Sequence, residues 1–178
     1  LDLATATPNS GTLTSLVDGN TYEVTATVTD GAGNATSDGS SNELTIDTSF
    51  PATPTITAQT ANSTTPTMTG TATVGAGETL TVTVSGATYT VIPTGTNWSL
   101  DLATATPSTG SLTPLADGNT YEVTATITDE AGNSTSDISS GEITIDTSAP
   151  SPAPTIDTLI ADNTTPTLTG TATVGAGE

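Results

Sequence analysis

The sequence has no basic side chain and no cysteine. Its 178 residues include no lysine, arginine or histidine against 19 acidic residues, which gives a formal charge of −19. Without cations there can be no side-chain salt bridge, no phosphate clamp and no electrostatic attraction to nucleic acid or anionic lipid. Without cysteine or histidine there is no thiol nucleophile, no disulfide, no Ser–His pair and no usual zinc or haem ligand. The composition therefore argues against nucleic-acid partners and against most kinds of catalytic centre.

Aromatic residues and long apolar runs are also scarce. Aromatics make up 3 % of the chain, and no apolar run approaches the roughly 20 residues of a membrane helix. The start shows no basic-then-apolar leader, and because it is Leu1 rather than methionine we expect a piece of a longer chain. High charge with few aromatics is also typical of disorder. However, 32 % of residues are hydrophobic and they alternate with the 47 threonines, which favours ordered β structure.

The strongest signal is an internal repeat. Residues 1–8 read LDLATATP and return unchanged at 100–107, and DGNTYEVTAT at 18–27 returns at 117–126. After one inserted residue the offset becomes 100, so that TTPTMTGTATVGAGE at 64–78 returns as TTPTLTGTATVGAGE at 164–178. A period of this length is too long for a solenoid unit and suits a small independent domain. We therefore expect the back half of one module (1–50), a complete module (51–150) and the front of a third (151–178).

Within the complete module, period-two alternation predicts strands. In residues 121–129, Tyr121, Val123, Ala125 and Ile127 face one way and polar residues face the other. The same reasoning predicts an inward-facing set: Met68, Gly70, Ala72, Val74, Leu80, Val82, Val84, Ala87, Tyr89, Val91, Trp98, Leu100, Leu102, Ile143 and Ile145. No stretch shows a sustained helical period. The prediction is an all-β protein.

The number and spacing of the strands indicate an immunoglobulin-like β-sandwich. About seven short strands are expected in 100 residues, separated by turns every 8–12 residues. The turn at 117–119 leads into Tyr121 at the start of the penultimate strand, as in a tyrosine corner, and Tyr22 repeats the arrangement. An ordinary core tyrosine after an ordinary turn is the alternative, and it leaves the fold unchanged.

These motifs, in this order, resemble a known family. TPTLTGTA, then LADGNTYEVTATITDEAGNST, then the linker IDTSAPSPAPTI are similar to the bacterial immunoglobulin-like extender domains of giant calcium-dependent adhesins, including RTX-type adhesins. The resemblance implies a secreted protein on the bacterial cell surface. It also implies a long stalk of near-identical modules, stiffened by Ca²⁺ at the junctions, that holds binding domains away from the cell. Asp47 and Asp129 stand at positions of the family's motifs.

The acidic residues are the candidate ligands for such a cation. Ca²⁺ takes 6–8 oxygen ligands, and this chain offers carboxylates without internal counter-charges. In a sandwich of this kind, the incoming linker, the loop after the second strand and the loop between the last two strands lie at one pole. That topology brings together Asp47, Glu78, Asp129 and Glu130, with Asp137 a weaker candidate, as a Ca²⁺ site between the first two modules.

Other junctions yield incomplete sets of ligands. The next junction would use Asp146 and Glu178, and Asp30 belongs to the corresponding pole of the first module. Asp117 and Asp18, in the DGN turns at the opposite pole, could each add a ligand from the upstream side. The alternative is that aspartate, glycine and asparagine simply form a tight turn there.

Two other functions remain as alternatives to a stalk, and a third, catalysis, is not expected. Carboxylate pairs can catalyse glycoside hydrolysis or proteolysis, but Asp47-Thr48-Ser49 and Asp146-Thr147-Ser148 lack the glycine of an aspartic-protease turn and recur once per module. We therefore expect no enzyme and no small-molecule substrate, and the neighbouring modules as partners. Threonine rows would suit an ice- or carbohydrate-binding module. A surface filament or sheath would need lateral contacts, bridged by Ca²⁺ across the acidic faces.

Overall fold

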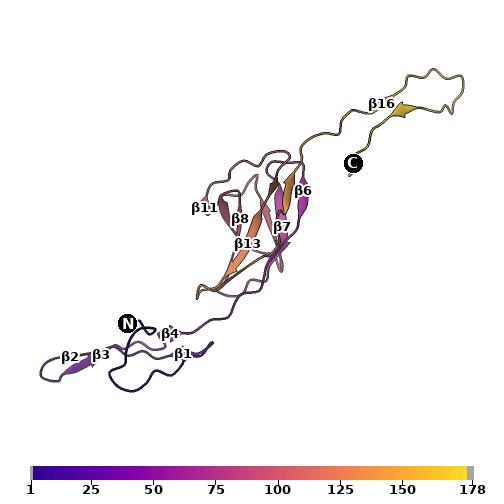
Figure 1. Ribbon diagram of the computed structural model, residues 1–178. Helices are drawn as coiled ribbons and strands as arrows, with labels where there is room; N and C mark the ends of the chain where they lie inside the picture. The colour runs from indigo at the N-terminus through magenta and orange to yellow at the C-terminus, as the bar shows by residue number, and fades with distance from the viewer. Residues whose placement is uncertain (1, 176–178) are drawn as a thin grey trace.

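The described part of the chain is built of β-strands. The computed structural model describes residues 2–175, and in these residues every regular element is a strand (Figure 1). The expectation of an all-β protein is confirmed. The middle of the chain holds β5 (Thr55–Ile56), β6 (Gln59–Ala61), β7 (Thr67–Thr71), β8 (Thr79–Val84), β9 (Ala87–Val91), β10 (Asn97–Asp101), β11 (Thr109–Gly110), β12 (Thr120–Tyr121), β13 (Val123–Thr128), β14 (Ser134–Ser136) and β15 (Ile143–Ile145).

These strands form three sheets around one core. The largest has the order β11-β9-β8-β13-β14, and all its pairings are antiparallel. Two three-stranded sheets, β10-β7-β5 and β12-β15-β6, supply the other side, and β6 runs parallel to β15. The pairing of β6 with β15 joins the beginning of the middle module to its end.

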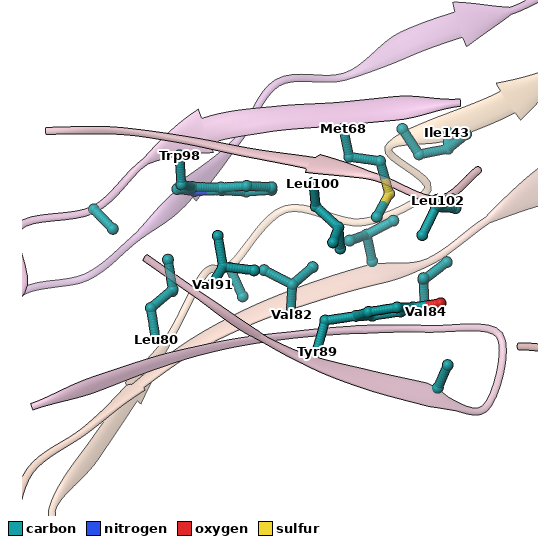
Figure 2. Close-up of a cluster of buried hydrophobic side chains, with 14 of the residues drawn as sticks. Met68, Leu80, Val82, Val84, Tyr89, Val91, Trp98, Leu100, Leu102 and Ile143 are labelled. Carbon is teal, nitrogen blue, oxygen red and sulfur yellow. The ribbon is translucent and has the colours of Figure 1, made fainter. Parts of the chain in front are cut away.

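The core confirms most of the expected inward-facing set. Figure 2 shows Trp98, Met68 and Leu100 facing Val82, Val91 and Tyr89 across the space between the sheets. Alternation explains this, because every second side chain of a strand points to the same face. Val74 is only partly buried. Leu115, which precedes the DGN turn, is buried although it was not in the expected set.

The strand expected at 121–129 is divided. β12 pairs with β15, whereas β13 pairs with β8 and β14, so the chain passes from one sheet to another at Glu122. At this switch a side chain takes the place of a neighbouring strand as acceptor for the Val123 N–H: Glu142 Oε2 accepts its hydrogen bond at 2.9 Å. The sequence pattern does not reveal such switches, because the alternation continues across them.

One glycine marks a close approach between strands. The indole N–H of Trp98 donates to the Thr55 carbonyl at 3.1 Å. A Cβ on Gly70 would collide with that carbonyl and would lie 2.7 Å from the Trp98 ring. Gly70 therefore provides the space in which the Trp98 side chain binds β5, the first strand after the linker.

The flanking segments repeat the middle strand pairings. Residues 2–50 contain β1 (Thr21–Tyr22), β2 (Thr27–Thr29), β3 (Ala35–Ser37) and β4 (Leu44–Thr45), and the other flank contains β16 (Thr155–Ile156) and β17 (Gly170–Thr171). Thr21 pairs with Thr45 as Thr120 pairs with Thr144, 99 residues later. Apolar side chains that are buried in the middle are exposed here: Val28 is 73 % exposed, whereas its counterpart Ile127 is 0 % exposed.

Candidate cation site at the module junction

The structure brings the incoming linker to the hairpin loop between β13 and β14. The side-chain amide of Asn133 donates a hydrogen bond to the backbone carbonyl of Asp47 at 3.0 Å. The turn before β8 lies beside the same loop, since a Cβ on Gly77 would be 2.9 Å from the Glu130 carboxyl carbon. The segments that carry Asp47, Glu78, Asp129 and Glu130 therefore meet at one pole, which we call the N-terminal pole.

Asp129 organises its own loop. Its Oδ1 accepts from the Asn133 backbone N–H at 2.8 Å and its Oδ2 from the Asn133 side-chain amide at 2.9 Å. These donors favour the charged carboxylate, and the side-chain bond from Asn133 is the main reason why the pKa of Asp129 lies below its ordinary value. Asp129 is thus an anion whose two oxygens are already engaged.

The other acids at this pole differ in how they are engaged. Glu78 caps its own turn, because its Oε2 accepts from the Gly75 N–H at 2.7 Å. Asp47 accepts from the Ser49 N–H at 3.0 Å through one oxygen. The Glu130 side chain is exposed and lies against Gly77.

The donor set has the right chemistry for a hard cation, but its geometry is incomplete. Carboxylate and carbonyl oxygens are the ligands that Ca²⁺ prefers. Within residues 2–175, however, no three acidic side chains converge closely enough to hold a metal ion. A cation at this pole would need these acidic side chains to move closer together.

At the opposite, C-terminal pole, Asp117 contacts the outgoing linker. Its Oδ1 accepts from the Thr147 N–H at 2.6 Å and its Oδ2 from the Ser148 hydroxyl at 2.8 Å. The bond from the Thr147 backbone is the main cause that lowers the pKa of Asp117. Asp146 accepts from the Ser148 N–H at 3.1 Å. Asp117 therefore does more than form a tight turn, since it binds the start of the next linker.

The remaining candidates lie apart from the junction. Asp30 holds the loop of the first module through Asn34, whose side chain donates to it at 2.8 Å. Asp137 accepts from the Ala125 N–H at 2.7 Å and from the Ser139 hydroxyl at 2.9 Å, so it extends the pairing of β13 with β14. Glu178 lies outside the described residues.

The sequence reasoning missed the residue that joins linker to loop. Asn133 was not among the candidate site residues, yet its side chain makes the contact with Asp47. The recurrence of AGN at 32–34 and 131–133 was the available signal.

The hydrogen bond expected of a tyrosine corner is present, because the Tyr121 hydroxyl accepts from the Ala116 N–H at 2.7 Å.

Comparison with family models, curated proteins and solved structures finds no match to this chain. In residues 2–175 no helix is long and apolar enough to cross a membrane. The function must therefore be argued from the repeat and from the contacts at the two poles.

Proposed function

We propose that the chain is part of a structural extender: a stalk of tandem immunoglobulin-like modules on a bacterial cell surface that holds a binding domain away from the cell. The observation that carries this proposal is the contact between Asn133 and the Asp47 carbonyl, because it ties the linker to the module that follows. A spacer without a catalytic role needs such contacts to keep its length. The repeat supports the proposal, since each further module extends the array by the same unit.

Two features of the fold support modules of the immunoglobulin-like kind. The parallel pairing of β6 with β15 closes the middle sandwich between its beginning and its end. The hydrogen bond between Tyr121 and Ala116, five residues upstream, has the form of a tyrosine corner.

Calcium is the cation that we propose for the N-terminal pole. Asp47, Asp129 and Glu130 would hold it, with Glu78 nearby, once their side chains move closer together. Asp30 would belong to the same kind of site in the first module, and Asp146 to that of the next junction. Because the chain has no basic residue, a bound cation would also reduce repulsion between the acidic pole and the incoming linker. At a free Ca²⁺ concentration about 100-fold above Kd, each site would add about 2.7 kcal/mol to the folded state.

Calorimetric titration of the 178-residue chain with CaCl₂ tests this proposal. We expect saturable binding and a higher melting temperature, both lost in Asp129→Asn together with Glu130→Gln. Asp101→Asn is the matched control, since Asp101 caps the loop after β10 through Ala103 and Thr104. Absence of binding at millimolar Ca²⁺ would rule out the calcium site but not the stalk.

A laterally associated filament is the second candidate. It is favoured by the outer face of the large sheet, where the hydroxyls of Thr126 and Ser136 pair at 2.8 Å and those of Thr83 and Thr88 at 3.0 Å. The strands of this sheet carry no aspartate or glutamate. Sedimentation analysis separates the two candidates, since a stalk stays monomeric with and without calcium and a filament does not.

A further inference from the structure

The linker between the first two modules is held on both sides by hydrogen bonds. On the upstream side, Asp18 Oδ1 accepts from the Thr48 N–H at 2.6 Å and Asp18 Oδ2 accepts from the Ser49 hydroxyl at 2.9 Å. The backbone N–H of Gly19, the next residue of the same turn, donates to the Ile46 carbonyl at 2.8 Å. The DGN turn therefore holds the linker from Ile46 to Ser49.

On the downstream side, the middle module binds the Asp47 carbonyl, which lies between the Ile46 and Thr48 groups that the DGN turn holds. The Asn133 side chain donates to the carbonyl of Asp47, the residue directly before Thr48. Further along, Pro51 and Pro54 are buried in the middle module. Neighbouring backbone groups are thus bound by two different modules, which leaves little length of linker to act as a hinge.

Both the DGN turn that binds the linker upstream and the AGN loop that binds it downstream occur a second time in the chain. Asp117 makes the upstream contacts with Thr147 and Ser148 at nearly the same distances, 2.6 and 2.8 Å. The AGN loop of the first module has the same internal bonds, since the Asn34 N–H and side-chain amide donate to Asp30 at 2.9 and 2.8 Å. These bonds lie within the loop itself, so contact with a linker needs little further ordering of the loop.

We infer that these residues form a linker clasp, made of Asp18, Thr48, Ser49, Asp47 and Asn133, which fixes the orientation of adjacent modules without metal. The inference rests on the proposed stalk function and adds to it a partner for each pole: the DGN turn and the AGN loop are two binding surfaces for one I-D-T-S segment. The two hydrogen bonds to the Asp18 carboxylate are charge-assisted, which makes them stronger than neutral ones. In this arrangement calcium adds stiffness to a junction that is already set.

Spin labels on the 178-residue chain in EDTA test the clasp. The chain has no native cysteine, so labels at Thr25→Cys and Ser99→Cys, both exposed and away from the loop of Asn34, report the distance between the first two segments. We expect a single narrow distance peak in the parent chain and its loss in Asp18→Ala and in Asn133→Ala. We also expect the Thr48 amide proton to exchange about tenfold faster in Asp18→Ala.

Two matched controls separate the clasp from general loss of structure. Asn34→Ala removes the same loop bond with no linker contact, and Asp117→Ala releases only the second linker, so both should keep the narrow peak. Asp18→Ala lies outside the middle module and so tests the clasp even if Asn133→Ala lowers stability. A broad distribution in EDTA that narrows only with CaCl₂, or equal distributions in Asn133→Ala and Asn34→Ala, would overturn the inference. Calcium binding is measured separately, so its failure leaves this result standing.

Discussion

Individual carboxylates in this protein make different hydrogen bonds, although the chain has no basic side chain to pair with them. Most of the exposed ones accept hydrogen bonds from backbone groups, as Asp18 does from Thr48. Glu142 is the exception, because it is 2 % exposed and its Oε1 has no hydrogen-bond partner among the described residues. An unpaired polar atom in the interior lowers stability.

Replacing Glu142 tests this cost directly. Glu142→Gln keeps an acceptor for the Val123 N–H but leaves an unpaired polar atom in place of Oε1, so we expect the free energy of unfolding to stay within about 0.5 kcal/mol of the parent. Glu142→Ala leaves that N–H unpaired, so we expect a loss of about 2 kcal/mol. Urea denaturation measures both. If the glutamine variant were clearly less stable than the parent, Oε1 would have a favourable role that these contacts do not account for.

At the scale of elements, the sequence predicted what depends on local pattern. Alternation identified the longer strands and nearly the whole core, from Met68 to Ile145, because a buried face needs an apolar residue at every second position. It could not predict the switch of sheets at Glu122, which depends on distant partners. For the same reason the sequence did not reveal that Asp117, a candidate metal ligand, binds two linker groups that are 30 and 31 residues away.

The contact between the DGN turn and the linker should respond to acid. Hydrogen bonds, first that of the Thr147 backbone, hold the pKa of Asp117 below its ordinary value of 3.8. A carboxylate with a lowered folded-state pKa contributes stability that is present above 3.8 and is lost as the pH falls through the folded pKa. We therefore expect the Thr147 amide resonance to shift with a midpoint below pH 3.8, and the shift to vanish in Asp117→Asn. A midpoint at or above that value would contradict the hydrogen-bonded arrangement.

For the molecule as a whole, the charge of −19 is the dominant electrostatic feature. In the middle module the acids lie mainly in turns and loops, since of its strands only β10 carries one, Asp101. Repulsion is therefore expected chiefly at the poles and at the linkers that join modules. Composition alone predicted the excess charge, and the expected topology already placed Asp47, Glu78, Asp129 and Glu130 at one pole, whereas their hydrogen-bond partners followed only from the structure.

Monovalent salt should stabilise the chain. Raising NaCl from about 10 mM to about 150 mM shortens the screening length from about 30 Å to about 8 Å, so we expect the melting temperature to rise by roughly 4 °C. CaCl₂ at matched ionic strength should raise it further if the N-terminal pole binds the ion, with MgCl₂ as the comparison. A melting temperature that is independent of NaCl would show that the acids do not repel one another across the folded chain.

The close packing of Trp98 over Gly70 gives the protein an optical reporter. Trp98 is the only tryptophan of the chain, it is 2 % exposed, and its indole is bonded to β5. Fluorescence excited at the red edge of indole absorption therefore comes from the middle module alone. Its quenching and wavelength can follow the unfolding of that module while the flanking segments remain spectroscopically silent.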